Sequence, residues 1–349
     1  PQTQQYLITS FGDGLTIWDG NSGTSSRDIE DVNYPFNTDK IAAAHYEEGM
    51  WISAFEESIY FQSEAGDWVP KSFGLIGDDE ILEITSDNDG QLWFRVDPQG
   101  SGGIIVYSPS LNTSVRLDNS VDKGGLPTRA VNDIEVDVEG NVWVGTDEGV
   151  AYFPRGIFLF EGPVNAIKPI LDGRFLLSNE EVSSIESDGG NRKWMGTENG
   201  AWLFNEFGDE LLEHFTIENS PLLSNQIIDI EIHDQTGELF ISTNLGLVSY
   251  RTGSTKGSPV HETKIKIFPN PVTPDFSGIV GMEGLAYNSE IKITDVSGNL
   301  VWQTTSNGGS ATWNLQTLQG GRPPSGIYLI FSSLPDGSDS LVGKIAIID

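Results

Sequence analysis

The side chains best suited to acid–base or metal chemistry are few and scattered in this sequence. It contains no cysteine and four histidines: His45, His214, His233 and His261. No two histidines share the i, i+4 spacing that pairs metal ligands on a helix, and none stands beside a nucleophile in the sequence. We therefore expect no catalytic residue and no metal site among them, and no cofactor.

Carboxylates are abundant, and a pair of them could hydrolyse a glycosidic bond. Four aspartates, however, recur at the same place in a repeated segment: Asp87, Asp137, Asp188 and Asp234. An aspartate in a turn accepts hydrogen bonds from backbone N–H groups shortly after it. We interpret all four as turn formers rather than catalytic acids. Residues 86–90, SDNDG, leave an adventitious Ca²⁺ site open as an alternative.

An anionic ligand needs positively charged hydrogen-bond donors, which lysine and arginine supply. Residues 261–349 carry five of them, and these are our candidate ligand-binding residues: Lys264, Lys266, Lys292, Arg322 and Lys344. The alternative for each is a solvated surface cation. Arg322 precedes two prolines in a rigid loop, so it is the first residue to mutate.

The charge balance limits the possible partners. The chain holds 51 acidic and 19 basic residues, a net charge of −32. Residues 261–349 contribute −3, which leaves −29 on the residues before them. Such a field repels phosphate backbones, so we expect no nucleic-acid partner. No apolar run approaches the roughly 20 residues that cross a bilayer, so we expect no membrane-spanning segment.

The elements that hold these side chains follow from a repeat. Segments such as NVWVGTDEGVAYF (residues 141–153) and NRKWMGTENGAWLFN (residues 191–205) recur six times. The copies are anchored on Leu7, Trp51, Trp93, Trp143, Trp194 and Phe240. The spacings of 44, 42, 50, 51 and 46 residues are typical of propeller blades.

Each good copy predicts three short strands separated by turns that contain glycine. We predict a β-propeller of six or seven blades over residues 1–252, beginning at the second strand of a blade. Residues 154–181 would form an outer strand with an unusual loop. The tryptophans are expected to pack between blades, although Trp202 and Trp302 could instead stack on sugars.

The repeat stops at a segment rich in Ser, Thr and Gly, residues 253–263, which we predict to be a linker. Residues 264–349 then alternate apolar and polar side chains in strand-sized blocks separated by turns such as DVSGN and PDGSD. About 85 residues of this kind predict a small antiparallel β-sandwich. The expected fold class is therefore all-β, a propeller followed by a sandwich.

Two resemblances rest on these motifs. The phrase D-x-x-G-N-x-W-x-G-T-x-x-G resembles the regulator-propeller repeats of bacterial periplasmic and surface proteins. The C-terminal block resembles the sorting-type β-sandwich of Bacteroidetes type IX secretion, at PNPV (269–272), ITDVSGNLV (293–301), SGIYLI (325–330) and KIAI (344–347). Together, residues 82–349 are similar to the C-terminal half of a propeller component of the type IX attachment complex.

This resemblance implies a non-catalytic scaffold on the extracellular face of the outer membrane. The implied partners are the sortase PorU, other attachment-complex proteins and anionic lipopolysaccharide, which the sortase attaches to cargo. Two alternatives stay open. One is the carbohydrate-sensing ectodomain of a hybrid two-component receptor, and the other is a secreted glycan-active cargo protein with a removable sorting domain.

Overall fold

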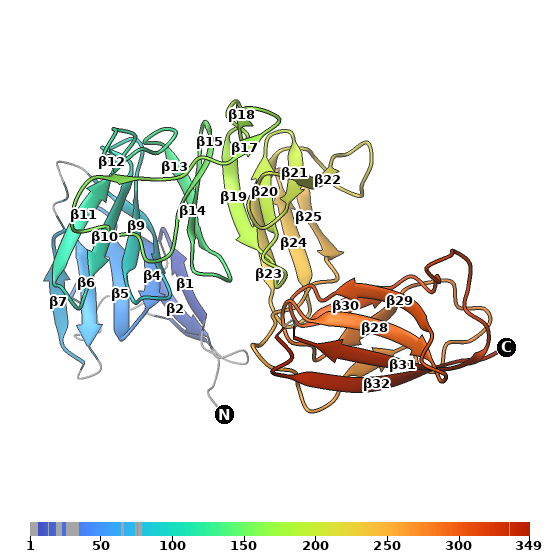
Figure 1. The fold of residues 1–349 in the computed structure, drawn as a ribbon. Coiled ribbons are helices and arrows are strands. Elements are labelled where there is room, and N and C mark those ends of the chain that lie inside the picture. Colours follow the sequence, from blue (N-terminus) through green and yellow to red (C-terminus); the bar gives the residue numbers. More distant parts are fainter. Residues whose placement is uncertain are drawn as a thin grey trace. The chain divides into compact units, whose positions relative to one another are not determined.

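The computed structural model describes residues 6–12, 14–18, 23–25, 35–63, 66–73, 75, 79–334 and 336–349. These residues form strands and turns and contain no helix, which confirms the all-β prediction (Figure 1). The chain divides into two compact units, Pro1–Ile185 and Glu186–Asp349. Our predicted domain boundaries, at residues 252 and 264, stay a prediction.

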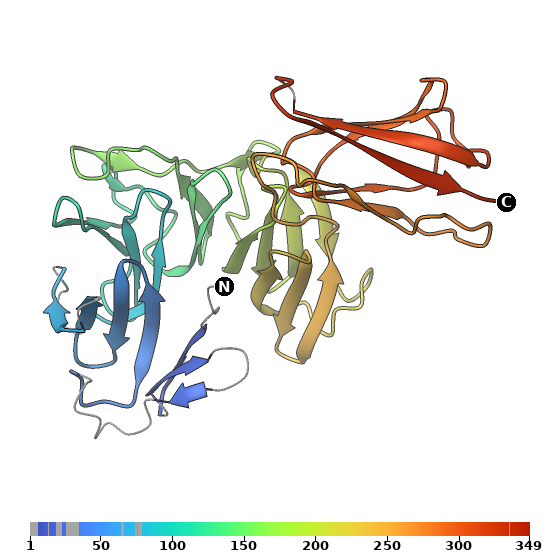
Figure 2. The ribbon, with the colours of Figure 1, turned by 90° about the horizontal axis from the view of Figure 1, so that it is seen from below.

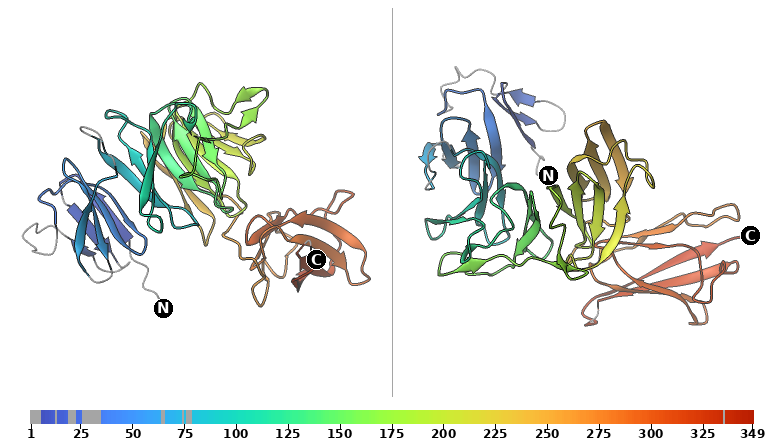
Figure 3. Two further views of the ribbon diagram at one scale, coloured as in Figure 1. Left: turned by 60° about the vertical axis from the view of Figure 1, so that its left-hand side comes forward. Right: turned by 90° about the horizontal axis from the view of Figure 1, so that it is seen from above.

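Within its described residues, the first unit contains four antiparallel meanders whose strands follow sequence order (Figures 1 and 3). Their strands are β1 (Tyr6–Ser10), β2 (Gly14–Trp18) and β3 (Gly23–Ser25); β4 (Ile41–Tyr46), β5 (Gly49–Ala54), β6 (Ile59–Ser63) and β7 (Trp68–Lys71); β8 (Ile81–Ser86), β9 (Leu92–Val96), β10 (Ile104–Ser108) and β11 (Thr113–Leu117); and β13 (Val131–Val136), β14 (Val142–Thr146) and β15 (Gly149–Phe153).

Two further meanders follow in the chain. The strands of the first are β19 (Val182–Ser187), which crosses the unit boundary, β20 (Lys193–Thr197), β21 (Gly200–Phe204) and β22 (Leu211–Phe215). Those of the second are β23 (Ile227–His233), β24 (Glu238–Thr243) and β25 (Gly246–Arg251). Up-and-down sheets of three or four strands are the blade unit that the repeat predicts.

The repeated phrase occupies the same place in the best-kept blades. Trp143 lies on β14, whose five residues are all buried, so both faces of this strand are covered. A strand buried on both faces needs no apolar–polar alternation, which explains the run VWVGT. Gly149 then begins β15 with a φ of 93°, a backbone conformation that glycine adopts without strain.

The segment 154–181 is more elaborate than the predicted outer strand. β16 (Val164–Asn165) pairs in parallel with β12 (Lys123–Gly124). β17 (Ile170–Leu171) and β18 (Arg174–Phe175) form a short hairpin. The blade β13–β15 is extended outward only by a single bridge between Tyr152 and Ile167.

The C-terminal region is a sandwich of two antiparallel sheets, drawn in orange and red in Figure 2. One sheet has the order β26-β27-β30 and the other β29-β28-β31-β32. The strands are β26 (Lys266–Phe268), β27 (Val280–Glu283), β28 (Glu290–Asp295), β29 (Leu300–Thr305), β30 (Ser310–Trp313), β31 (Gly326–Ser333) and β32 (Ser340–Ile347). Their inward side chains, Trp313 and Ile330 among them, form one apolar core.

The predicted linker is bound to its neighbours through its backbone. Gly309 donates its N–H to the carbonyl of Thr255 at 2.8 Å, and Tyr287 donates to that of Ser258 at 3.1 Å. Lys256 donates its backbone N–H to the carbonyl of Asp234 at 2.7 Å. The segment therefore joins the turn after β23 to the sandwich by hydrogen bonds rather than acting as a free tether.

Candidate ligand-binding groove

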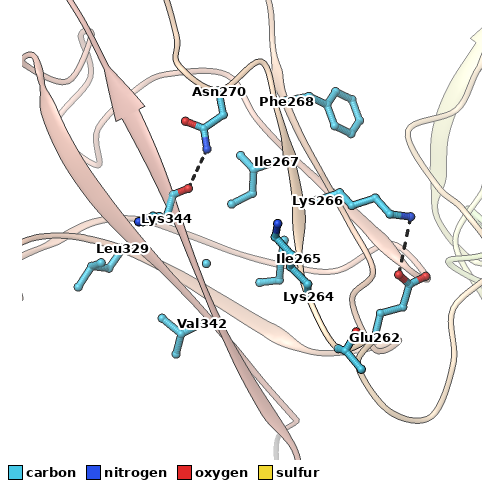
Figure 4. Close-up of a pocket in the computed structure, with 12 residues that line it drawn as sticks. Glu262, Lys264, Ile265, Lys266, Ile267, Phe268, Asn270, Leu329, Val342 and Lys344 are labelled. Atoms are coloured by element: carbon cyan, nitrogen blue, oxygen red, sulfur yellow. Dashed lines mark hydrogen bonds and ion pairs between the residues drawn. The ribbon is translucent and has the colours of Figure 1, made fainter.

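A groove of about 890 Å³ lies at the edge of the sandwich, between β26 and β32 (Figure 4). Its lining consists of residues 262–268, Asn270, Leu329 and residues 342–344. Apolar side chains, including Ile265, Ile267 and Val342, supply most of the floor. The groove lies between edge strands of the two sheets, so its shape follows from the sandwich itself.

The groove brings together three of the five candidate ligand-binding residues, Lys264, Lys266 and Lys344. All three side chains are exposed. The Lys266 ammonium lies 3.7 Å from a carboxylate oxygen of Glu262, which is a long and solvated ion pair. Three ammonium groups around an apolar floor, with one carboxylate among them, suit an amphiphile that carries negative charge.

Two neighbouring residues set the spacing of the groove walls. Gly343 lacks a Cβ, and a Cβ at this position would lie 2.9 Å from Cδ1 of Ile267. Asn270, from the PNPV motif, donates its side-chain amide to the carbonyl of Lys344 at 2.9 Å and accepts from the N–H of Ala346 at 3.1 Å. The motif thus fixes β26 to β32 and holds Lys344 at the rim.

The other two candidates lie outside the groove. Lys292, on β28, lies 3.1 Å from a carboxylate oxygen of Glu290. Arg322 donates to the carbonyls of Phe276 at 2.6 Å and Thr273 at 2.9 Å, so its guanidinium stabilises that loop. Ligand contact by any of the five stays a prediction.

The sandwich also contains an Asp–His–Ser arrangement that the sequence did not reveal. His261 Nδ1 lies 2.7 Å from Asp339 Oδ2, and His261 Nε2 lies 2.7 Å from Ser332 Oγ. This is the order of a catalytic triad. Ser332, however, is only 1% exposed and its hydroxyl donates onward to Ser289 at 3.0 Å. The three residues lie 71 and 78 positions apart, so no local motif could have indicated them.

Three of the four repeated aspartates form their turns as predicted. Asp137 Oδ1 accepts the N–H groups of Glu139 and Asn141, and its Oδ2 accepts the Trp143 indole at 3.0 Å. Asp87 and Asp188 accept the corresponding backbone N–H groups. The Oδ2 of Asp87 also accepts the Trp93 indole N–H at 2.9 Å, so this carboxylate has the turn role, and a Ca²⁺ site at residues 86–90 stays an untested alternative.

The fourth aspartate, Asp234, does not form its turn in the same way. In the turn after β23, Gly237 donates its N–H to the carbonyl of His233 at 2.8 Å. The side chain of Asp234 instead lies 2.7 Å from the ammonium of Lys256. Eight residues lie between the paired Glu231 and Phe240, against seven between Glu135 and Trp143, so Asp234 lies one position later in its turn and its side chain pairs with the linker.

Carboxylates of the first blade strands connect one blade to the next. Asp133 Oδ2 accepts the N–H of Ile185 at 2.5 Å, and Glu186 accepts that of Ile232 at 3.0 Å. Burial, reinforced by the nearby Asp133 carboxylate, raises the pKa of Glu83 to about 8, although Arg95 lies 2.8 Å away and opposes the shift. These acids are held by backbone donors, as structural groups are.

The two tryptophans considered for sugar stacking are both packed. The ring of Trp202 stacks on that of His214, with centroids 3.4 Å apart. Trp302 packs against the sandwich core, with its centroid 6.2 Å from that of Trp313. Both observations agree with the packing interpretation.

Metal-binding clusters and membrane-spanning helices are both absent from the described part of the chain. No group of three or more His, Cys, Asp or Glu side chains there could hold a metal ion. No described helix is long and apolar enough to cross a membrane.

Comparison with known families gives two partial matches. Residues 266–348 match the secretion system C-terminal sorting domain. Residues 125–148 match the two component regulator propeller repeat. No curated protein sequence matches the chain.

Solved structures match over nearly the whole chain. PorZ, an essential surface component of the type IX secretion system of Porphyromonas gingivalis, is 22% identical with a TM-score of 0.59. The match covers 99% of this chain and 58% of PorZ. The extracellular domain of the putative hybrid two component system BT3049 from B. thetaiotaomicron is 15% identical with a TM-score of 0.53, over 100% of this chain and 45% of that one.

At these identities the likeness establishes the fold, which is the predicted propeller with a C-terminal sandwich. The resemblance to PorZ that the motifs predict is confirmed, and the chain spans less than two thirds of that protein. The sorting-domain match at residues 266–348 supports a role and a location related to secretion.

Proposed function

We propose that this protein is a non-catalytic scaffold of the type IX secretion attachment complex, on the extracellular face of the outer membrane. Its partners would be the sortase PorU and neighbouring complex proteins, with anionic lipopolysaccharide as its ligand. The single observation that carries the proposal is the groove of Lys264, Lys266 and Lys344 within a sorting-type sandwich.

The groove suits a lipopolysaccharide for two physical reasons. Its apolar floor can bury part of an acyl chain or a sugar face, since apolar burial contributes about 25 cal/mol per Å². Its ammonium groups can donate charge-assisted hydrogen bonds to phosphate or carboxylate groups. The rest of the chain, at a net charge of −29, would repel the same ligand, so binding would be directed to the sandwich.

A charge reversal tests this assignment. Lys344→Glu should weaken the binding of purified anionic lipopolysaccharide by about tenfold, because one charged donor is replaced by a repelling carboxylate. Lys123→Glu, an exposed lysine on β12, makes the same charge change outside the sandwich and should leave the affinity within about twofold. Calorimetry or surface plasmon resonance measures both. Equal losses for the two variants would refute a site in the groove.

The absence of catalysis is part of the proposal. In the Asp339–His261–Ser332 arrangement, the serine is buried and its hydroxyl is bonded to Ser289. A nucleophile needs room for a substrate carbonyl beside it and donors for the developing oxyanion. We infer that these residues fix the start of the groove wall, which follows directly at Glu262.

A second candidate function is favoured by the same sorting-domain match, because exported cargo also carries such a domain. In that case the sandwich would be removed near Lys264 during export. Mass spectrometry of the surface-bound protein distinguishes the two. An intact C-terminus supports a scaffold of the complex, and a product that ends near residue 264 supports cargo.

A further inference from the structure

The connector between β15 and β19, residues 154–181, supports a hairpin at two fixed points. Tyr152 and Ile167 exchange both of their backbone hydrogen bonds, each at 2.8 Å. Beyond the hairpin, Leu176 is buried and donates its N–H to the carbonyl of Pro169 at 2.9 Å. The two ends of the projecting segment are therefore held together.

Between these anchors, β17 and β18 pair around a tight turn that stands out from the preceding blade (Figures 1 and 3). Asp172 and Gly173 adopt φ values of 50° and 77°, the positive angles of a two-residue hairpin turn. A two-stranded hairpin alone is marginally stable in water, so the anchors are what keep its shape. The hairpin is thus ordered before any partner binds.

The hairpin tip, defined as Ile167, Lys168, Ile170, Arg174 and Phe175, combines apolar and cationic groups. Ile167, Ile170 and Phe175 are 45%, 55% and 54% exposed. The Lys168 ammonium lies 5.8 Å from the centre of the Phe175 ring, and Arg174 is exposed. Among the described residues, neither cation has a carboxylate partner within ion-pair distance.

We propose that the hairpin tip is a docking element for a folded protein whose surface offers an apolar cleft rimmed by carboxylates. Aromatic side chains and arginine dominate the binding energy of protein interfaces, and the tip presents one of each beside two isoleucines. The cations, which have no carboxylate partners among the described residues, are complementary to an acidic rim. A hairpin that is already ordered loses little entropy on binding.

A protein fits this surface better than a membrane does. Peripheral insertion depends on apolar area together with attraction to anionic lipids. Three apolar side chains are a small area, and the net charge of −29 on the residues before 261 opposes approach to an anionic surface. A protein partner can restrict its carboxylates to the few positions that face Lys168 and Arg174.

The test is site-specific photocrosslinking with the full chain in the cells that naturally make it. A photoreactive phenylalanine analogue replaces Phe175, and the same analogue at Leu111, which is 63% exposed in the turn after β10, is the control. Both positions are on the surface, so neither replacement should alter folding, and equal melting temperatures verify this. Arg174→Glu is combined with the analogue at position 175.

We expect position 175 to give an adduct with one protein, mapped by mass spectrometry to an apolar cleft beside Asp or Glu residues. Arg174→Glu should reduce that adduct by at least about tenfold, the effect of losing one interface anchor. An adduct with lipid, no adduct, an equal adduct from position 111, or indifference to Arg174→Glu would each overturn the proposal. Because the hairpin and the groove are separate surfaces, Lys344→Glu should leave this adduct unchanged.

Discussion

Asp137 illustrates how one side chain fixes a blade. It is 2% exposed and accepts hydrogen bonds from two backbone N–H groups and from the indole of Trp143. The aspartate and the tryptophan are six residues apart, so turn and core are joined within one repeat. The recurrence of an aspartate at this place in the repeat is visible in the sequence, which is why the turn role could be predicted for three of the four.

We predict that Asp137→Ala lowers the free energy of unfolding by about 3 kcal/mol, because several hydrogen bonds to a buried charged acceptor are lost, among them the bond from the Trp143 indole. Asp234→Ala should cost less than about 1 kcal/mol, since it removes only an exposed ion pair with Lys256. Urea denaturation compares the two. Similar losses would show that the aspartates are equivalent after all.

The raised pKa of Glu83 predicts how its contribution to the stability of the folded state depends on pH. Burial, with the Asp133 carboxylate nearby, raises its pKa from 4.5 to about 8. The folded state then holds a proton that the unfolded state releases above pH 4.5, so the stability that Glu83 contributes is full below pH 4.5 and is lost as the pH rises toward 8. Glu83→Gln should remove this decline. The decline should exceed about 1.4 kcal/mol, which is the free energy that corresponds to a shift of one pKa unit.

The control for this prediction is Glu139→Gln, which changes an exposed acid in a blade turn. Its denaturation profile between pH 4.5 and 8 should follow that of the unchanged protein. If Glu83→Gln keeps the same decline as this control, the raised pKa is wrong and the ion pair with Arg95 governs the carboxylate.

At the scale of elements, the blades could be predicted and the connections between them could not. Aromatic anchors and glycine turns recur with a period, whereas the backbone pairing of the linker depends on no side-chain pattern. Thr255 and Ser258 accept hydrogen bonds through their carbonyls, a property that every residue shares. A composition typical of a flexible tether thus accompanies a segment that is firmly bound.

The bound linker predicts a large effect at Gly308. A Cβ at this position would lie 2.0 Å from the carbonyl oxygen of Thr255 and 2.4 Å from that of Gly189. Gly308→Ala should therefore increase hydrogen exchange at the Gly309 and Tyr287 amides by about a hundredfold, equivalent to about 3 kcal/mol of local stability.

Gly320→Ala is the matched control for Gly308→Ala. Gly320 has a φ of 81°, close to the left-handed region, but no heavy atom lies within 4 Å of an added Cβ. It therefore reports backbone strain alone, about 1 kcal/mol. Exchange that rises equally in both variants would mean that the linker does not depend on the close approach at Gly308.

The same limits apply to the candidate site. Composition points to these cations, because residues 261–349 carry five basic residues and a net charge of only −3, against −29 on the residues before them. Composition does not show which lysines converge, because Lys344 and Lys264 line one groove only when β32 lies beside β26. The prolines after Arg322 predict a rigid loop, but the sequence does not show that its guanidinium donates to the backbone carbonyls of Phe276 and Thr273.

At the scale of the whole molecule, the proposed role divides recognition between two kinds of surface. Blades hold loops such as the hairpin tip in fixed positions, which suits protein partners. The sandwich carries the cationic groove and suits an anionic glycolipid. Neither function requires a reacting group, in agreement with the structural roles of the carboxylates and of His261.

The most direct test of the central claim is made in the natural host. The variant Lys264→Glu, Lys266→Glu, Lys344→Glu replaces the protein at an equal surface amount, and the fraction of export substrates anchored to the cell is measured. The account predicts that substrates are released into the medium, because the groove no longer supplies lipopolysaccharide for attachment. Anchoring at the level of the unchanged protein would contradict it.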